Sequence, residues 1–210
     1  MTRIVLVDDH EIVRRGIRGI LVEHPGFQVV GEAGDYGELR RILKAHAADV
    51  VVMDIGLPGK SGIEIVQLLA ADHPAIRVLM LSIYPEDQYG LRALKSGAAG
   101  YLNKASAPEE LVKAVETVAS GRKYVSAALA QTLVDNLTGE TSERPHEKLS
   151  NREYQTLCLM ARGKRLSDIA QALALSPKTV SVYRARILEK MGLENNAELT
   201  HYALKHKLVD

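Results

Sequence analysis

Five short apolar runs in the first half of the chain constrain its fold more than any other feature. They are rich in Val, Ile and Leu, and segments long enough to form helices separate them. Strands that are apolar along their whole length are typical of a parallel sheet covered on both faces, with the connecting helices as the cover. The five runs are residues 3–9, 27–33, 49–54, 77–82 and 100–103.

The segments between these runs carry helix-start signals. Asp35, Ser61 and Ser106 are each followed three residues later by glutamate. This is the capping-box pattern, in which two side chains satisfy free backbone amides at the start of a helix. Five strand–helix units of this kind predict a doubly wound α/β domain with a five-stranded parallel sheet, which we assign to residues 1–121.

Helical signals replace the alternating pattern after this domain. Residues 124–137 are amphipathic and predict a helix, and residues 138–148 are turn-rich without an apolar anchor, which predicts a flexible tether. We therefore interpret residues 122–147 as a linker helix followed by a tether. The remainder, residues 148–210, predicts a small all-α domain of four helices.

Local signals set the helices of this second domain. Ser150-x-x-Glu153 is a capping box flanked by Leu149 and Tyr154, which are spaced as a hydrophobic staple. Ser176 precedes a proline, which is a cap followed by proline at the first helical position. The sequence predicts helices that begin near 151, span 166–174 and 177–191, and end with one over about 196–207.

Charge is divided unequally between the two parts of the chain. The formal net charge is +1, but residues 1–146 carry −3 and residues 147–210 carry +4. This difference predicts different partners for the two parts. Cys158 is the only cysteine, which excludes an internal disulfide and is consistent with a cytoplasmic protein. No apolar stretch reaches the ~18 residues needed to cross a bilayer, so we expect no membrane association.

Polar residues follow the predicted strands where each strand ends. Asp8 and Asp9 follow the first run, Asp54 ends the third, Ser82 ends the fourth and Lys104 follows the fifth. The carboxyl ends of parallel strands share one edge of the sheet, where doubly wound domains bind their ligands, so we expect these side chains to converge. Three clustered carboxylates need a cation, and Mg²⁺ suits carboxylate and phosphate oxygens. One carboxylate can then accept a phosphoryl group as a nucleophile.

These residues, with Pro58 and Gly62, make residues 2–120 resemble the receiver domain of two-component response regulators. The resemblance implies the flavodoxin-like order of strands and phosphorylation of Asp54 by a histidine kinase. It implies that Asp9, Asp54 and the main-chain carbonyl of Gly56 hold Mg²⁺, with Asp8 acting through water. It further implies that Ser82 and Lys104 contact the phosphoryl group, and that Tyr101 is a switch aromatic that rotates inward.

Each of these residues also has an ordinary interpretation when taken alone. Asp8 and Asp9 are compatible with a turn at a strand end, Lys104 with a solvated surface lysine, and Tyr101 with simple packing. Only their joint arrangement favours a phosphorylation site.

The predicted helix over 177–191 has two distinct faces. At about 100° per residue, Val180, Ile187 and Met191 lie together and form a packed face, with Tyr183 at its edge. Short side chains, one valine and cations occupy the opposite face. Such a face suits the major groove of DNA, where small residues allow close approach and cations reach guanine edges or phosphates.

Residues 149–208 resemble a LuxR-type helix-turn-helix domain, and its pairing with a receiver resembles the NarL/FixJ class of response regulators. The resemblance implies that the last helix is a dimerisation surface. A solvated helix face remains the alternative for each cation. The residues expected to contact DNA are Lys178, Thr179, Ser181, Val182, Tyr183, Ala185, Arg186 and Lys190.

Together these patterns predict a DNA-binding transcriptional response regulator rather than an enzyme. Its expected partners are a histidine kinase, a second copy of the chain when phosphorylated or DNA-bound, and a roughly palindromic promoter site. Phosphorylation is expected to free the helical tail from the receiver, to promote dimerisation, or both. One alternative is a phosphorylated adaptor that binds protein through its helical tail. A less favoured one is an aspartyl-nucleophile phosphatase, which by resemblance would carry its nucleophile on the first strand.

Overall fold

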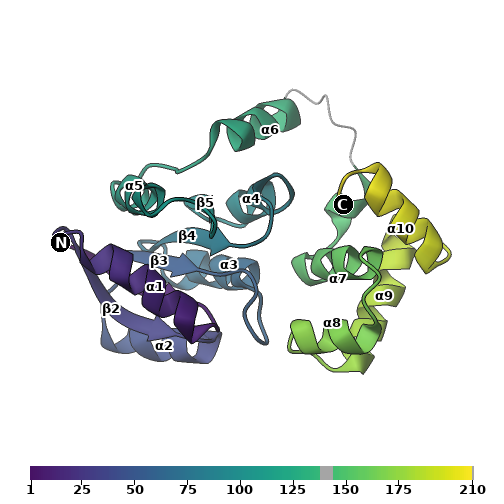
Figure 1. Cartoon of the computed structure of the whole chain (residues 1–210), viewed down its shortest axis with the longest axis horizontal. Helices are drawn as coiled ribbons and strands as arrows, with labels where there is room; N and C mark the ends of the chain where they lie inside the picture. Colours follow the sequence, from purple (N-terminus) through teal and green to yellow (C-terminus); the bar gives the residue numbers. More distant parts are fainter. Residues whose placement is uncertain (138–143, 210) are drawn as a thin grey trace. The chain divides into compact units, whose positions relative to one another are not determined.

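The computed structural model describes residues 1–137 and 144–209. It divides into two compact units, Met1–Asp135 and Asn136–Asp210, which are described separately below. The elements of the first unit (Figure 1) are β1 (Thr2–Val7), α1 (Glu11–Val22), β2 (Phe27–Ala33), α2 (Tyr36–Ala45), β3 (Val50–Met53), α3 (Gly62–Asp72), β4 (Arg77–Ser82), α4 (Glu86–Lys95), β5 (Gly100–Asn103), α5 (Pro108–Ala119) and α6 (Ala127–Leu137).

The first unit contains the predicted five-stranded parallel sheet. Its strand order is β2-β1-β3-β4-β5, and each pair of neighbours runs in parallel. The order reverses between β1 and β3, because the chain leaves β1 for one edge and returns past it. This confirms the flavodoxin-like doubly wound prediction and places the ends of β1 and β3 at the switch point.

The core of this unit follows from strand alternation. Apolar side chains of the strands, among them Leu6, Val52 and Leu81, pack with α1 and α5 on one face of the sheet. Right-handed crossovers place α2, α3 and α4 on the other face (Figure 1). Burial on both faces explains why these strands are apolar along their whole length.

The predicted capping boxes have three different outcomes. Ser61 and Glu64 form a complete box at the start of α3. Asp35 caps α2 by accepting from the Glu38 amide, but the Glu38 carboxylate accepts from the Gly34 amide, one residue earlier than the box requires. The Ser106 prediction is wrong. Helix α5 begins one residue later, with Ala107 as its N-cap and a proline at the first helical position, because proline has no amide that needs a cap.

The predicted linker helix, α6, packs on the first unit. Tyr124 pairs with the edge of β5 through an isolated bridge to Gly100. The Ser126 hydroxyl donates to the Glu86 carboxylate at 2.7 Å, and Leu129 is buried, with the backbone of Gly90 in α4 close beneath it. The residues after 121 therefore extend the receiver-like unit onto α4 instead of leaving it at once.

Part of the predicted tether is folded. Residues 138–143 lie outside the described residues, but Pro145–Lys148 forms a short 3-10 helix, η1. His146 is buried there, and its Nδ1 lies 2.9 Å from the Tyr202 hydroxyl. Residues 144–148 therefore belong to the helical unit. The buried His146 side chain holds this segment in place, although the segment has no apolar anchor.

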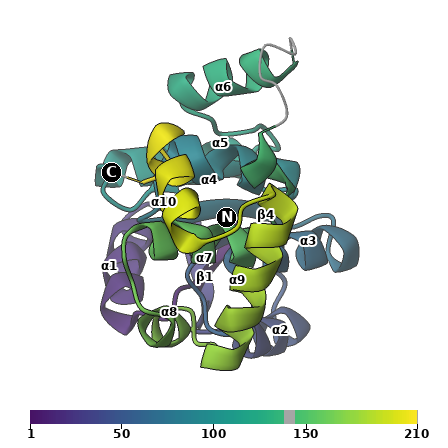
Figure 2. The same ribbon diagram turned by 90° about the vertical axis from the view of Figure 1, so that its right-hand side faces the viewer.

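Within residues 144–209, the second unit has the predicted four α-helices. Its first helix begins with a complete Ser150–Glu153 capping box, and Leu149 and Tyr154 are both buried as the staple predicted. Figure 2 shows its helices from a second direction. Its helices are α7 (Asn151–Ala161), α8 (Leu166–Ala172), α9 (Pro177–Met191) and α10 (Asn196–Lys205).

Helices α8 and α9 form the helix-turn-helix. Ala174 in the tight connection has a φ of 51°, and Ser176 caps α9 by accepting from the Thr179 amide. Gly192 ends α9 in the left-handed conformation, the usual helix stop. Among the helices in the described ranges, none combines the length and apolar content that crossing a membrane requires.

Candidate functional site

The residues predicted to form the site meet at the carboxyl edge of the sheet. Asp54 directly follows β3, and its amide donates to the Val7 carbonyl at the end of β1. The amide of Lys104, just after β5, donates to the Ser82 carbonyl at the end of β4. Continued strand pairing therefore places β1, β3, β4 and β5 in register at this edge, as the sequence predicted.

Lys104 joins two of the acids directly. Its Nζ lies 2.5 Å from Asp8 Oδ2 and 3.2 Å from Asp54 Oδ2. Both carboxylates are almost fully buried, at 2% and 6% exposure, and the lysine side chain is 13% exposed. An ammonium held between two buried carboxylates partly neutralises charges that would otherwise repel each other.

The negative charge of the Asp54 carboxylate is only partly balanced by its surroundings. Burial raises the pKa of the Asp54 carboxyl above its ordinary value, Lys104 opposes this shift, and the charge of Asp8 adds to it. The Asp54 Oδ1 atom is buried and accepts no hydrogen bond within the described residues. One oxygen of Asp54 is therefore available for a ligand.

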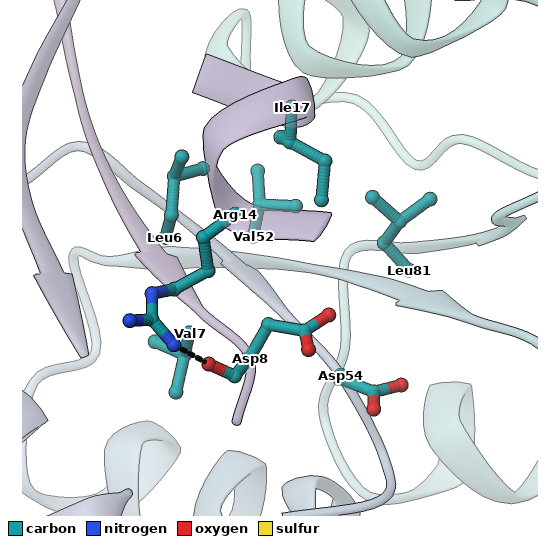
Figure 3. Close-up of a pocket in the computed structure, with 8 residues that line it drawn as sticks. All are labelled: Leu6, Val7, Asp8, Arg14, Ile17, Val52, Asp54 and Leu81. Carbon is teal, nitrogen blue, oxygen red and sulfur yellow. Dashed lines mark hydrogen bonds between the residues drawn. The ribbon is translucent and has the colours of Figure 1, made fainter. Parts of the chain in front are cut away.

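Asp8 and Asp54 border a small hollow beneath the strand ends (Figure 3). Apolar side chains of the sheet and Ile17 line the rest of it, and the Arg14 guanidinium donates to the Asp8 carbonyl. The volume is about 10 Å³, the lower limit for one water molecule. This hollow is too small for an organic substrate, so the chemistry of these acids must occur at the outer rim.

Ser82 and Tyr101 are buried next to this cluster. The Ser82 hydroxyl is close enough to lower the pKa of the Asp54 carboxyl, although it makes no well-formed hydrogen bond in the described part of the chain. Tyr101 is fully buried, and its hydroxyl donates to the Tyr84 carbonyl at 2.7 Å. Burial raises the pKa of Tyr101, which keeps the phenol protonated. Tyr101 already points inward in this structure.

Two glycines give the cluster its shape. A Cβ at Gly62 would lie 2.0 Å from the Asp54 carbonyl oxygen, so the start of α3 approaches Asp54 only because residue 62 has no side chain. A Cβ at Gly56 would lie 3.2 Å from Asp54 Oδ2, so the space beside the carboxylate stays open.

Asp9 lies on the open side of the cluster. Its side chain is 35% exposed, and the His10 Nδ1 atom is 2.8 Å from its Oδ1 and 3.3 Å from Asp8 Oδ1. Asp8, Asp9 and His10 thus bring three possible metal ligands within 4.8 Å of one another. The sequence reasoning did not consider His10, although its position directly after the acid pair was the available signal.

The residues present fit a hard divalent cation. Buried carboxylates dominate the donor set, and the unpaired Asp54 Oδ1 atom is a buried acceptor without a donor among the described residues. Such oxygens suit Mg²⁺, which takes one or two carboxylates and keeps its other positions for water and phosphate.

Helix α9 has the two faces that its sequence predicted. Val180, Ile187 and Met191 are buried, with exposures of 0%, 0% and 8%. Val182 is 42% exposed and is the large apolar residue of the outer face. Around it the side chains of four of the predicted DNA-contacting residues are exposed, namely Lys178, Ser181, Ala185 and Arg186.

The other candidates on α9 are already engaged within the unit. The Lys190 Nζ lies 2.7 Å from Glu153 Oε2, in the capping box of α7, so this lysine stabilises the domain. Thr179 and Tyr183 are half-buried, and the Thr179 hydroxyl is 2.8 Å from the Ser176 hydroxyl. The free cationic surface of α9 is therefore smaller than its sequence suggests.

A basic loop that the sequence reasoning did not single out precedes the helix-turn-helix. Arg162, Lys164 and Arg165 are all exposed between α7 and α8, around Gly163 with a φ of 75°. The signal was present as three cations within four residues, and only the location of the loop next to the helix-turn-helix gives it meaning.

Two family models match the chain. The model for the response regulator receiver domain matches residues 4–116. The model for bacterial regulatory proteins of the luxR family matches residues 147–203. Together the two matches contain the acidic cluster and the helix-turn-helix.

Curated relatives match over nearly the whole length. Response regulator UvrY of Escherichia coli O6:H1 is 39% identical over 209 residues, 99% of this chain and 96% of the relative. Response regulator GacA of Pseudomonas protegens is 40% identical over 212 residues, 100% and 99% of the two chains. The chain belongs to the two-component response regulators.

Solved structures of a response regulator have the same architecture. RcsB from Salmonella enterica serovar Typhimurium, bound to promoter rprA in the presence of phosphomimetic BeF3-, superposes with a TM-score of 0.66 at 27% identity, covering 96% of this chain and 97% of RcsB. Another structure holds two RcsB dimers bound to two parallel DNAs, with a TM-score of 0.60 at 27% identity and the same coverage.

This response regulator is of the NarL/FixJ class, with a receiver domain followed by a LuxR-type helix-turn-helix domain. The class consists of regulators, so the phosphatase alternative is wrong. The receiver of this response regulator contains Asp8, Asp54, Ser82 and Lys104, and its helix-turn-helix domain contains α9.

Proposed function

We propose that this response regulator is phosphorylated on Asp54 by a histidine kinase and that phosphorylation controls its binding to promoter DNA. The observation that carries the proposal is the Lys104 ammonium, which lies between the buried carboxylates of Asp8 and Asp54. A buried acid beside a lysine ammonium can exchange one negative charge for a larger one, because the same ammonium can pair with phosphoryl oxygens.

The phosphoryl step uses one oxygen of Asp54 as the nucleophile. The Asp54 oxygen forms a bond to phosphorus, the bond from phosphorus to the imidazole nitrogen of the kinase breaks, and that nitrogen keeps the electron pair. Lys104 is placed to turn from the carboxylates to the phosphoryl oxygens, and the Ser82 hydroxyl is placed to donate to one of them. Magnesium supplies charge neutralisation of the phosphoryl oxygens when bound.

Four groups of this chain would hold the cation. They are the carboxylates of Asp9 and Asp54, the main-chain carbonyl of Gly56, and Asp8 through a water molecule. The unpaired Asp54 Oδ1 and the open side at Asp9 support this assignment.

The signal leaves the site through buried residues. Phosphorylation replaces the single negative charge of the Asp54 carboxylate with a phosphoryl group of about −1.5 to −2, which draws the Ser82 hydroxyl toward it. Tyr101 packs beside Ser82 and bonds to the Tyr84 carbonyl, just before α4. Glu86 in α4 accepts a hydrogen bond from the Ser126 hydroxyl, which lies just before α6. A shift at Tyr84 therefore has a path to the linker, and through it to dimerisation.

DNA recognition belongs to the exposed face of α9. Lys178, Val182 and Arg186 are placed to read base edges or phosphates, with Ser181 and Ala185 permitting close approach. Thr179, Tyr183 and Lys190 support the helix, and the basic loop around Gly163 contacts phosphates. The rprA-bound RcsB structure and the LuxR-family match support this assignment.

Dimerisation fits the proposed target. Two helix-turn-helix domains related by a twofold axis match a roughly palindromic promoter site, and RcsB dimers on DNA support this arrangement. A protein that meets both a phosphoryl donor and the chromosome must work in the cytoplasm, which is the location that we propose.

The test compares operator affinity before and after treatment with acetyl phosphate and Mg²⁺. The native protein should gain affinity, Asp54→Asn should lose the gain, and Asp72→Asn, which removes an exposed acid on α3, should keep it. An unchanged gain in Asp54→Asn would overturn the phosphorylation switch.

DNA binding and the adaptor alternative differ in their response to salt. Binding to random duplex should weaken steeply with salt if the basic surface contacts phosphates, because bound counterions are released. Binding to duplex that is absent or insensitive to salt would favour the adaptor.

A further inference from the structure

The side chain of His10 has no role in its helix. His10 is the N-cap of α1, but its side chain makes no capping hydrogen bond, and the imidazole is 69% exposed. Its main-chain amide donates to Asp8 Oδ1 at 2.9 Å, which fixes the backbone beside the acid pair. The ring is therefore held beside the acids, where its Nδ1 atom contacts Asp9 and Asp8 and does not contribute to the helix.

The separations around His10 match those of ligands on one metal ion. Ligands at about 2.1 Å from an octahedral ion lie about 3.0 Å apart when they occupy adjacent positions. The His10 Nδ1 atom is 2.8 Å from Asp9 Oδ1 and 3.3 Å from Asp8 Oδ1. One cation can therefore bind Asp9 Oδ1 and His10 Nδ1 together without backbone movement.

The two neighbouring acids leave this position accessible. Lys104 pairs with Asp8 through Oδ2, so Asp8 Oδ1 remains on the side of His10. Asp54 Oδ1 is buried without a partner in the described part of the chain, so a second carboxylate oxygen at this edge of the sheet also remains available for a ligand. Without a cation, His10 and Asp9 form only an exposed ion pair worth under about 1 kcal/mol.

We propose that His10 is a ligand of the divalent cation held by Asp9 and that it shifts the selectivity of the receiver from Mg²⁺ toward first-row transition-metal ions. Imidazole adds little to the binding of a hard ion such as Mg²⁺, but it strengthens the binding of Mn²⁺, Fe²⁺ or Co²⁺. This inference rests on the proposed function only in that Asp9 holds a cation. It assigns His10 as a determinant of which metal supports phosphorylation.

The experiment uses Mn²⁺ and Mg²⁺ on the full-length protein without phosphoryl donor. Mn²⁺ affinity is measured from the electron paramagnetic resonance signal of the free ion, and Mg²⁺ affinity from its competition with Mn²⁺. Nitrogen couplings in the electron spin-echo envelope then report whether imidazole is bound. His10→Gln should lower Mn²⁺ affinity about 10-fold, change Mg²⁺ affinity less than about 2-fold, and remove the nitrogen coupling.

Control variants make the outcomes decisive. His46→Gln removes an exposed imidazole at the end of α2 and should change nothing. His10→Asn, with a side chain favoured at N-caps, should behave as His10→Gln and guards against a folding defect. Equal losses of Mn²⁺ and Mg²⁺ affinity in His10→Gln, or nitrogen coupling that persists in it, would overturn the proposal. Asp54→Asn tests the proposed function separately, since it should weaken both ions while the nitrogen coupling remains.

Discussion

The two functional regions of this response regulator are built in opposite ways. The proposed phosphorylation site collects residues from four strand ends, and its central carboxylates are buried. The proposed DNA-binding surface comes from one helix, and its side chains are exposed. The geometry of the first site depends on how several strands pair, whereas the geometry of a helix face depends mainly on helical periodicity. The charged groups of the first site are therefore buried and paired with one another. Those of the second site remain in contact with water.

Two lysines express this contrast most clearly. Lys104 lies between two buried acids and is itself only 13% exposed. Lys190 pairs with one buried acid, Glu153, but is 40% exposed. Because water screens the second pair and not the first, removal of the two ammonium groups should have effects of different size.

Removal of Lys104 should give the largest effect. Lys104→Met leaves Asp8 and Asp54 as neighbouring buried carboxylates, and the free energy of unfolding should fall by about 3 kcal/mol at pH 7 without divalent cation. Chemical denaturation measures this difference, with the exposed Lys60→Met as control. A loss no greater than that of the control would show that Lys104 is not needed to hold the acids together.

Truncation on the outer face of α9 should have an intermediate effect on binding and none on folding. Val182→Ala and Arg186→Ala should each weaken specific DNA binding by about 1–3 kcal/mol, and non-specific binding by less. Binding isotherms on operator and random duplex measure the two losses. Equal losses on both duplexes would mean that these residues contact only the DNA backbone.

Asp54→Asn should stabilise the metal-free protein at pH 7, by less than Lys104→Met destabilises it. Burial raises the pKa of the Asp54 carboxyl above its unfolded value, so the folded state binds a proton more tightly than the unfolded state. The stability that follows from this is present below about pH 4 and is lost as the pH rises through the folded pKa.

The gain from the asparagine should therefore grow with pH and vanish in acid. Urea denaturation of both proteins between pH 4 and pH 8 measures it. A gain that does not change with pH would contradict the assignment to charge burial.

Removal of Lys190 should give the smallest effect. Burial alone would raise the pKa of Glu153, but hydrogen bonds from Lys190 and Ser150 lower it overall. The pair therefore stabilises the domain above the ordinary pKa of glutamate, and this contribution fades as the pH falls. Lys190→Met should cost about 0.5 kcal/mol at pH 7 and leave DNA affinity unchanged. A loss of affinity without a loss of stability would restore Lys190 as a DNA contact.

Local patterns account for the parts that the sequence predicted well. Strand ends at Asp8 and Asp54, and the packed face of α9, follow from apolar runs and helical spacing. Pairings between distant residues account for the rest. His146 pairs with Tyr202, 56 residues away, and Lys190 pairs with Glu153, 37 residues away. No local sequence pattern predicts either contact. The prediction that Ser106 caps a helix was wrong for another reason. Pro108 occupies the first helical position and moves the helix start by one residue.

Chemical mapping of the phosphoryl group tests the central claim most directly. The protein is treated with acetyl phosphate and Mg²⁺, reduced with borohydride to convert an acyl phosphate to the alcohol, and digested for mass spectrometry. We expect one modified position, residue 54, converted from aspartate to homoserine, and no modification at Asp8 or Asp9. Modification at another residue, or none in a folded protein, would contradict it.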